Sequence, residues 1–375
     1  MLRYSTLLTL AFLVFPVALS PSPAAARPIV EVAFVLDTTG SMAGLIEGAK
    51  RKIWSIATSI VETNPDAEIR MGLVAYRDIG DDYVTRKFDL TADIQDLYAH
   101  LLELKARGGG DWPESVNEAL YVAVDKLSWS KGGDICRIVF LVGDAPPHMD
   151  YAQDMKYPQV LALAKQKDIL VNAVQAGGAR DTERVWREIA QLGNGRYIPI
   201  PQDGGQIVVI ETPYDIEIIE LQRRINGTVI PYGPKSRQSR IEDKLGQVAA
   251  APRSSASEMA SYLNKSGSGA IASGRAAEAI TGDGDLVADV TAGRQKLSSV
   301  KEEELPASLR GLAPAQRQDA IDKNMGERKA LTGRMAELVK KRDQYVVEQR
   351  KKAPQKTADS FDRAVEETLR AQVKR

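Results

Sequence analysis

Asp37, Thr39 and Ser41 stand at alternate positions in the sequence DTTGS, directly after an unbroken apolar run. Gly40 allows the backbone to turn tightly between them, so we expect the three side chains to lie on one turn. Carboxylate and hydroxyl oxygens are the ligands that hard cations such as Mg²⁺ prefer, usually with water completing the shell. The stretch therefore predicts a metal site, with Mg²⁺ as the favoured ion and Mn²⁺ or Ca²⁺ as alternatives.

The apolar run before Asp37 identifies the element that must position these residues. Residues 30–36 are rich in β-branched side chains and do not alternate with polar ones, which indicates a strand buried on both faces of a sheet. In open α/β sheets, ligands bind in the crevice at the carboxyl ends of the strands. We therefore expect the polar residues that end this run to face such a crevice.

Apolar runs and amphipathic stretches alternate along the chain as far as residue 200. The expected strands are 30–36, 68–76, 83–90, 136–142, 169–175 and 196–200, and the expected helices are 42–64, 94–104, 116–127, 157–168 and 181–192. Strands that alternate with helices of this length imply a parallel sheet covered by helices on both faces. We predict an α/β fold with a doubly wound, mostly parallel six-stranded sheet and a C-terminal α-helical region.

The spacing of Asp37, Thr39 and Ser41 resembles the metal-ion-dependent adhesion site of the von Willebrand factor type A family, whose first motif is Asp-x-Ser-x-Ser. The resemblance covers about residues 29–203. It implies strand order three-two-one-four-five-six, with the short hairpin strand antiparallel, and a metal site built from three loops. Asp144, at the end of the expected strand 136–142, matches the last aspartate of the family's site.

The middle loop of the site reads GGGDWPE and departs from the commonest pattern of the family, which supplies a threonine there. The loop is similar to the Asp-x-Pro-Glu loop of integrin β subunits, whose glutamate binds metal. Glu114 falls where the threonine would sit when residues are counted back from the helix that begins near Ser115. Asp111 is the alternative ligand, or belongs to a neighbouring ion, and both acids stay candidates.

The charges of the three loops give an independent reason to expect a cation. If the sheet has the implied order, Asp37, Asp144 and at least one of Asp111 and Glu114 converge in one crevice. Two like charges about 4 Å apart repel by about 4 kcal/mol at an effective dielectric constant of about 20. A divalent ion or protons must relieve this repulsion. The simpler interpretation, that Asp37 and Ser41 only cap the next helix, requires no acids in two distant loops.

The resemblance implies a protein partner, because adhesion sites of this family leave one coordination position open and an acidic side chain of the partner often completes it. An additional anionic ligand such as Glu114 would weaken that attraction, so capture of an acidic group stays a hypothesis. Five residues at the end of the second core strand and after the fourth are candidates for the partner-facing rim: Tyr76, Arg77, Asp78, His148 and Tyr151.

The sequence gives little support for an enzymatic function. No His-Glu-x-x-His pair, P-loop or Gly-x-Ser-x-Gly elbow is present, and the loop after the first strand lacks a dinucleotide-binding fingerprint. We therefore predict a non-catalytic interaction protein. Two alternatives are a divalent-metal-dependent hydrolase with His148 as base, and a scaffold whose metal only stabilises loops.

The first 26 residues have the features of a secretory signal peptide. A short basic region at Arg3 precedes an apolar stretch, and PSPAAA ends with the small residues of a cleavage site, so we expect the mature chain to begin at Arg27. An uncleaved N-terminal anchor is the alternative. We predict an exported protein, in a periplasm or at the cell surface, with no insertion into the bilayer after cleavage.

Bulk composition limits the partners and the covalent chemistry of the chain. The 375 residues carry a formal net charge of zero, so no overall field favours nucleic acid or anionic lipid. A single cysteine, Cys136, excludes an internal disulfide, and we expect it to be a buried structural thiol.

We divide the chain into five segments on the basis of composition and periodicity. The segments are a signal peptide at 1–26, the main domain at 27–205, an extension docked on it at 206–235, a Ser/Ala/Gly-rich linker with some helix at 236–284, and a helical module at 285–375. Apolar stripes in the last segment predict two or three amphipathic helices that pack on each other or on the main domain.

Overall fold

The computed structural model describes residues 28–65, 67–132, 134–203, 210–272, 284–352 and 360–373. The predicted signal peptide, 1–26, lies outside these residues. Six strands form one sheet in the order β3-β2-β1-β4-β5-β6, in which only β3 is antiparallel to its neighbour. The strands are β1 (Ile29–Asp37), β2 (Glu68–Tyr76), β3 (Thr85–Thr91), β4 (Ile135–Gly143), β5 (Ile169–Ala176) and β6 (Asn194–Ile200). The predicted fold class and strand order are confirmed.

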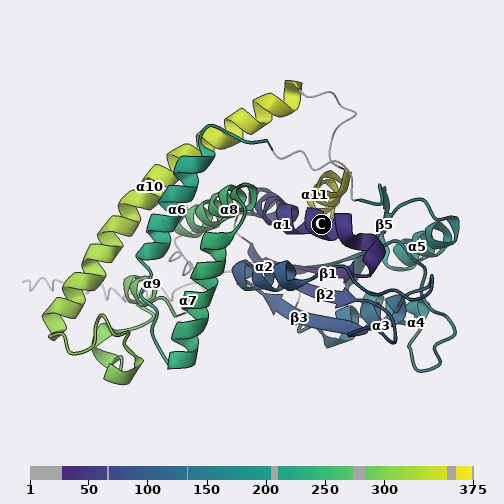
Figure 1. The fold of residues 1–375 in the computed structure, drawn as a ribbon, viewed down its shortest axis with the longest axis horizontal. Coiled ribbons are helices and arrows are strands. Elements are labelled where there is room, and N and C mark those ends of the chain that lie inside the picture. Colours follow the sequence, from purple (N-terminus) through teal and green to yellow (C-terminus); the bar gives the residue numbers. More distant parts are fainter. Residues whose placement is uncertain are drawn as a thin grey trace, which may run out of the picture.

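Helices cover both faces of this sheet because the central strands carry apolar side chains on both faces. In β1, for example, Val32 and Phe34 enter one core and Ala33 and Val35 enter the other. Figure 1 shows α1 and α11 on one side of the sheet and α3 and α4 on the other. The first face carries α1 (Ala43–Thr63), α2 (Ile94–Glu103) and α11 (Ser360–Gln372), and the second carries α3 (Val116–Tyr121), α4 (Tyr157–Gln166) and α5 (Arg180–Leu192).

One predicted helix has two parts. The expected helix 116–127 begins as α3 and continues as a π-helical turn over Val122–Lys126. Such turns are rare within proteins and are often found near functional sites. Here the α-helical half follows directly after the loop that contains Glu114, so it fixes where that loop ends.

The strand register aligns the carboxyl ends of the three central strands. Asp37 pairs with Tyr76 across β1 and β2, while Leu36 pairs with Val142 across β1 and β4. The residues that follow these ends therefore leave the sheet at the same edge. A short 3₁₀ helix, η1 (Gly40–Met42), connects β1 to α1 at this edge.

A second group of helices lies beside the sheet domain (Figure 1). It contains α6 (Asp215–Gly227), α7 (Lys235–Ala250), α8 (Arg253–Ala272) and α10 (Pro314–Lys352). Apolar residues of α6, α8 and α10 form one core, which includes Ile218, Ala260 and Met335. Met259 and Tyr262 of α8 instead enter the core under α1, so α8 joins the two groups.

The structure differs from the predicted linker at 236–284. Residues 235–250 and 253–272 are helical, and α8 buries Ser257, Ala260 and Ser261. Small side chains let helices approach closely, so the Ser- and Ala-rich composition that suggested a linker here serves helix packing. Residues 273–283 of this segment lie outside the described residues.

The structure also divides the predicted helical module at 285–375. Its first part, α9 (Leu286–Thr291), forms a small core with Ile230, Leu305 and Ile321, and two short 3₁₀ helices, Leu297–Ser299 and Glu302–Glu304, lie between α9 and α10. The last helix, α11, is separate: Val365 and Leu369 are buried in the core of the sheet domain. The sequence left open whether these helices pack on each other or on the main domain. Helix α10 packs against other helices, including α9, whereas α11 packs on the main domain.

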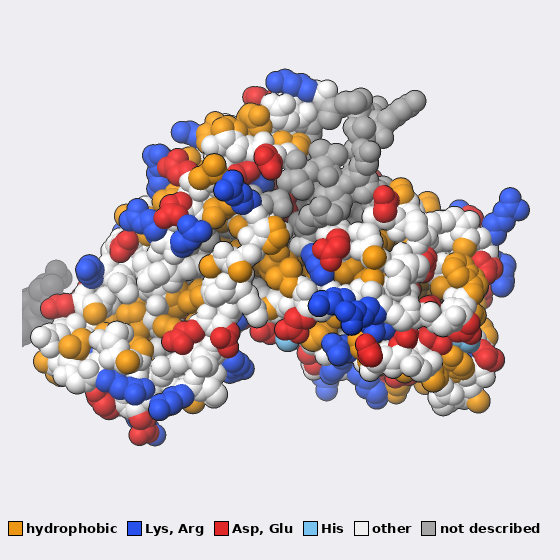
Figure 2. All heavy atoms as spheres, in the orientation of Figure 1, with side chains coloured by type: hydrophobic (Ala, Val, Ile, Leu, Met, Phe, Trp, Pro, Cys, Tyr) orange, Lys and Arg blue, Asp and Glu red, His pale blue; other side chains and the backbone are white. Residues whose placement is uncertain are grey.

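The surface and the single thiol complete the description. Basic and acidic side chains are mixed over the face seen in Figure 2. In the described ranges, no helix has both the length and the apolar character that a membrane span requires. Cys136 is half-buried rather than fully buried, and its Sγ lies 3.7 Å from the main-chain oxygen of Gln372 in α11.

Candidate metal centre

Asp37 is the last residue of β1 and is fully buried. Its Oδ1 accepts hydrogen bonds from the main-chain nitrogen of Thr39, at 2.8 Å, and from Thr39 Oγ1, at 2.7 Å. Thr39 Oγ1 lies 3.4 Å from Ser41 Oγ. The structure therefore brings the three residues of the first motif together on one turn, with the Thr39 hydroxyl group between the carboxylate and the Ser41 hydroxyl group.

Glu114 comes from the glycine-rich loop and is buried against this turn. Gly109 has a φ of 83°, and a Cβ atom at that position would lie 3.2 Å from Glu114 Oε1 and 3.3 Å from Thr39 Cβ. Glu114 and Thr39 therefore lie on either side of the same glycine. The Glu114 main chain is held by the loop after β4, since its nitrogen donates to Pro146 O.

Asp144 follows β4 directly and is also buried. Its Oδ2 accepts a 2.6 Å hydrogen bond from Gln202 Nε2, and its main-chain oxygen accepts one from Thr182 Oγ1. A Cβ atom on Gly143 would lie 3.1 Å from Asp37 Oδ2, so Asp37 closely approaches the backbone that leads into Asp144. Sequence reasoning missed Gln202, although its place just after β6 puts it at the same edge of the sheet.

Each of the three acids contributes one buried oxygen that has no hydrogen-bond partner. These atoms are Asp37 Oδ2, Glu114 Oε2 and Asp144 Oδ1. A buried carboxylate oxygen without a donor is costly, because it has lost water and gained nothing in exchange. A divalent cation held between these acids, directly or through bound water, would compensate the lost donors, so the donor types present fit such an ion.

The pKa values of two of these acids reflect the same arrangement. Burial raises the pKa of Asp37 to about 7, although the hydrogen bonds from Thr39 oppose this, and Asp144 and Asp81 add to the rise. Burial raises the pKa of Glu114 to about 9, with further contributions from the charges of Asp37 and Asp78. Both shifts show a site with an excess of negative charge in a poorly solvated position.

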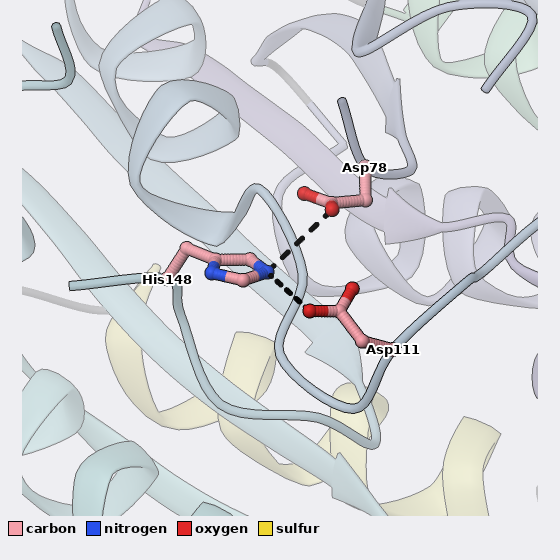
Figure 3. A group of neighbouring side chains, drawn as sticks. All are labelled: Asp78, Asp111 and His148. Carbon is pink, nitrogen blue, oxygen red and sulfur yellow. Dashed lines mark ion pairs between the residues drawn. The ribbon is translucent and has the colours of Figure 1, made fainter. Parts of the chain in front are cut away.

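The two acids of the middle loop have different surroundings. Glu114 lies in the buried centre, whereas the side chain of Asp111 is 63% exposed and its Oδ2 is 3.5 Å from His148 Nε2. Figure 3 shows Asp111 beside His148 and Asp78. Glu114 is therefore the loop acid that borders Asp37, and Asp111 belongs to a second cluster.

Two residues of the predicted partner-facing rim are turned inward, so the prediction is wrong for them. Tyr76 is fully buried, and its hydroxyl group donates a 3.4 Å hydrogen bond to Val142 O. Arg77 is buried as well and donates to the main-chain oxygens of Thr38 and Lys105. The reason is that Tyr76 lies in the core on one face of the sheet, while Arg77 lies between the loops that follow β1 and α2. A tyrosine there fills core volume, and an arginine ties loops together.

The remaining rim candidates form one group around His148. His148 and Asp78 are buried, whereas Tyr151 is half-buried. The rings of His148 and Tyr151 stack with centroids 4.0 Å apart. The three side chains therefore form one packed group. The rim prediction is wrong for Asp78 and His148 as well, because they are buried like Tyr76 and Arg77, and Tyr151 is the one of the five candidates that is partly open to solvent.

Three large apolar side chains in the same loops are exposed, and the sequence analysis did not select them. Ile79 is 50% exposed, Trp112 46% and Met149 50%. They come from the loop after β2, the loop before α3 and the loop after β4. Single exposed apolar residues are common on protein surfaces, so the sequence alone contains no signal that identifies these three, which come together only because their loops meet at one edge of the sheet.

Comparisons with known proteins agree with this description of the sheet domain. Residues 31–211 match the family model of the von Willebrand factor A domain, so the predicted resemblance to that domain is confirmed for this region, which carries the sheet and most of its surrounding loops. The chain is 32% identical over 122 residues to a putative ariadne-like RING finger protein R811 of Acanthamoeba polyphaga mimivirus. That match covers 32% of this chain and 12% of the viral protein, so the chain spans about an eighth of the length of this relative.

Several solved structures are similar to part of the chain. BatB from Bacteroides thetaiotaomicron is 15% identical, with a TM-score of 0.35 over 60% of this chain and 99% of that one. The SpRpn10 VWA domain is 13% identical, with a TM-score of 0.36 over 47% of this chain and 89% of that one. An aerotolerance-related membrane protein from Bacteroides fragilis is 15% identical, with a TM-score of 0.32 over 58% of this chain and 98% of that one.

Proposed function

We propose that the chain is an exported, non-catalytic protein that binds another protein through a divalent cation held by Asp37, Thr39, Ser41, Glu114 and Asp144. The observation that supports this most directly is the set of three buried carboxylate oxygens without donors at one edge of the sheet. The match of residues 31–211 to the von Willebrand factor A domain adds support, because interaction with proteins is typical of that family.

The donors of the centre favour a hard cation. All five side chains offer oxygen, and none offers nitrogen or sulfur. Such a set suits Mg²⁺ best, with Mn²⁺ or Ca²⁺ as alternatives, and water or a partner's oxygen would complete the shell. Thr39 holds Oδ1 of Asp37 through two hydrogen bonds, so the other oxygen of this carboxylate, Oδ2, is the one left for the ion.

The charge of the centre limits how strongly it attracts an acidic group. Three ionised carboxylates around one divalent ion leave a net charge of −1, so a partner carboxylate gains less here than at a centre with two acids. Apolar contact must then supply more of the binding free energy. Ile79, Trp112 and Met149 offer that contact in the surrounding loops, and we propose that they form the partner-facing rim together with Tyr151.

Metal binding is tested by thermal unfolding of the full chain during titration with Mg²⁺, Mn²⁺ and Ca²⁺. Saturation at about 100 times the dissociation constant should add about 2.7 kcal/mol to the free energy of unfolding. Asp37→Ala should abolish the increase. A protein whose melting is unaffected by any of the three ions, or whose Asp37→Ala variant responds like the parent, is not a metal-binding protein of this kind.

Partner binding is tested by co-purification from the native cell envelope, with and without chelator. Trp112→Ala should reduce recovery of the partner while leaving the metal-dependent melting shift intact. Ile216→Ala is the matched control, because Ile216 is 70% exposed on α6, away from the site loops. Equal loss of the partner in both variants would place the contact elsewhere.

Export rests on residues 1–26 and has its own test. N-terminal sequencing of the protein recovered from the periplasm or the cell surface should begin at Arg27. Recovery of a cytoplasmic protein that retains its first residues would contradict the proposed export but not the proposed metal centre.

One observation favours the alternative of a metal-dependent hydrolase. His148 Nδ1 lies 2.8 Å from Asp150 Oδ1, an arrangement that orients a general base. Turnover of model phosphate or peptide substrates that disappears in His148→Ala, while Mg²⁺ still stabilises the variant, would establish this activity. Absence of turnover in the metal-loaded parent protein supports the non-catalytic proposal.

The scaffold alternative, in which the metal only stabilises loops, needs a test that leaves the packing of α11 intact. Deleting residues 285–375 would remove Val365 and Leu369 from the main core and confuse instability with loss of contact. Val347→Asp on α10 is the better variant, because Val347 is 51% exposed and lies outside that core. Loss of the partner in this variant, with Trp112→Ala unaffected, would assign partner contact to the helices.

A further inference from the structure

Asp78, Asp111 and His148 form a second cluster of metal-ligating side chains at the same edge of the sheet. They come from three loops, which follow β2, precede α3 and follow β4. Figure 3 shows both aspartates directed at the same nitrogen of the imidazole ring. His148 Nε2 is 3.5 Å from Asp78 Oδ2 and 3.5 Å from Asp111 Oδ2, and the three atoms all lie within 4.8 Å of one another.

His148 Nε2 is buried and has no hydrogen-bond partner among the described residues. The side chain is only 7% exposed, so water does not readily reach this nitrogen. Hydrogen bonds between a charged nitrogen and a carboxylate are about 2.7–2.9 Å long, which is well below the observed 3.5 Å. Ligands that bind a tetrahedral zinc ion at 2.0–2.1 Å are separated from each other by about 3.3–3.4 Å. The two distances from His148 Nε2 match ligands around an ion better than a direct ion pair, and the two aspartate oxygens lie within 4.8 Å of each other.

The groups behind these side chains hold them in the orientation that metal ligands require. Asp150 Oδ1 lies 2.8 Å from His148 Nδ1, which leaves Nε2 free to bind an ion. Ser115 Oγ donates to Asp78 Oδ1 at 2.7 Å, and Tyr151 Oη donates at 2.8 Å to Asp78 Oδ2, the oxygen that faces His148. Carboxylate–histidine pairs and hydrogen-bonded ligand carboxylates of this kind typically surround protein metal sites.

We propose that Asp78, Asp111 and His148 bind a second divalent cation, and that this ion is of the zinc type. An imidazole nitrogen suits Zn²⁺ better than Mg²⁺ or Ca²⁺, which take oxygen ligands. Three protein ligands leave a fourth tetrahedral position, and the exposure of Asp111 opens that position to solvent or to a partner. The protein would then carry two centres of different ligand chemistry.

The two centres share a short segment of main chain but no side chain. Ser115, which supports Asp78, follows Glu114 directly, and His148 N donates a 3.1 Å hydrogen bond to Glu114 O. Because their ligands differ, each centre can be removed without the other. The second centre does not depend on the proposed function.

The proposal is tested on the full mature chain, stripped with chelator and kept in excess Mg²⁺ so that the oxygen-only centre is saturated. Zn²⁺ titration by calorimetry should then show one equivalent bound. Asp111→Asn should weaken Zn²⁺ at least about 100-fold, since loss of a supporting residue alone costs about 10–100-fold. The exposed position of Asp111 makes this variant safe for folding, and His148→Gln provides a second ligand variant.

Matched controls separate the two centres. His100→Ala removes the only other histidine of the chain, which lies on α2, and should leave Zn²⁺ affinity unchanged within about threefold. Asp37→Ala should abolish stabilisation by Mg²⁺ and leave Zn²⁺ binding intact. In nuclear magnetic resonance spectra, Zn²⁺ should shift the imidazole signals of His148 and not those of His100.

Three results overturn the proposal. Equal Zn²⁺ affinity in the parent and in both ligand variants places the ion elsewhere. Loss of Zn²⁺ in Asp37→Ala, with Asp111→Asn unaffected, assigns it to the oxygen-only centre. Absence of Zn²⁺ binding, with His148 titrating as an imidazolium, leaves only an ion-pair cluster with Asp78, Asp111 and Asp150. Because Mg²⁺ stabilisation is measured in the same variants, failure here is distinct from failure of the proposed function.

Discussion

Asn172 and Gln372 exchange two hydrogen bonds across the main core, although 200 residues separate them in the chain. Asn172 Nδ2 donates to Gln372 Oε1 at 3.0 Å, and Gln372 Nε2 donates to Asn172 Oδ1 at 2.9 Å. Both side chains are buried. The pair fixes the end of α11 to β5, so a helix outside residues 31–211 completes the apolar cover of the sheet.

Breaking this pair should destabilise the whole sheet domain. Gln372→Leu leaves the Asn172 amide group buried without its partner, which should lower the free energy of unfolding by about 1–3 kcal/mol. Urea denaturation measures the change. The double variant Asn172→Leu, Gln372→Leu should recover only part of the loss, because Asn172 Oδ1 also accepts from Arg196 N.

Arg370→Ala is the control for the same helix. Arg370 is 53% exposed and forms only a 3.8 Å ion pair with Glu62, so its loss should stay within about 0.5 kcal/mol. If Gln372→Leu costs no more than Arg370→Ala, α11 contributes little to the stability of the sheet domain.

Stability of the cation-free protein should fall as pH rises. In the folded chain, burial raises the pKa of Glu114 from 4.5 to about 9 and that of Asp37 from 3.8 to about 7. Between the unfolded and folded values the native state binds more protons than the unfolded state, so the free energy of unfolding decreases with pH in that range. Urea midpoints from pH 5 to pH 9, in chelator, should therefore decline.

Glu114→Gln isolates this effect from other titrating groups. The variant cannot ionise at position 114, so its midpoint should change less with pH than that of the parent, with the largest difference near pH 9. Saturating Mg²⁺ should also flatten the parent's curve, because the ion favours the ionised acids. Parallel curves for parent and variant in chelator would show that Glu114 keeps an ordinary pKa.

Any side chain at position 143 should destabilise the protein as long as the hydroxyl group of Tyr76 is present. A Cβ atom on Gly143 would lie 2.3 Å from Tyr76 Oη and 3.1 Å from Asp37 Oδ2, and both side chains are buried. Gly143→Ala should therefore destabilise the protein by about 1–3 kcal/mol and weaken Mg²⁺ binding. Adding Tyr76→Phe removes the closest atom and should restore part of the stability. Failure of that second substitution to restore any would mean that the strain lies at Asp37 or in the backbone.

The sheet could be predicted because its physical cause is local. Strands buried on both faces must be apolar throughout, and the polar residues after Leu36 and Val142 mark where those strands leave the sheet. Asp37 and Asp144 follow directly from that rule, since parallel strands share one carboxyl edge. The stripe of Val365 and Leu369 likewise predicted a helix with an apolar face, but a stripe does not specify which of two surfaces will cover it.

The choice between Asp111 and Glu114 could not be made from the sequence because backbone torsions decide it. Gly108 and Gly109 have φ values of 78° and 83°, and the main chain of Glu114 bonds to Pro146 and His148 in the loop after β4, so that Glu114 is buried while Asp111 is exposed. The inward direction of Tyr76 has a similar origin. Its strand position was predicted correctly, but alternation at the strand end depends on which loops cover it.

These torsions lead to the last prediction, which compares two adjacent glycines of the middle loop. Gly109 has a positive φ, and a Cβ atom there would press on Glu114 Oε1 and on Thr39. Gly110 has neither constraint, since a Cβ atom there would meet nothing within 4 Å. Gly109→Ala should therefore weaken Mg²⁺ binding about tenfold or more, while Gly110→Ala should leave it unchanged.

The comparison measures geometry rather than charge, since neither substitution adds or removes an ionisable group. Calorimetric titration with Mg²⁺ gives the two affinities, and thermal unfolding in chelator shows whether each variant is folded. A loss confined to Gly109→Ala means that the relative placement of Glu114 and Thr39 sets the affinity. Equal affinities would contradict the assignment of Glu114 as a ligand, because displacing a ligand must weaken binding of the ion.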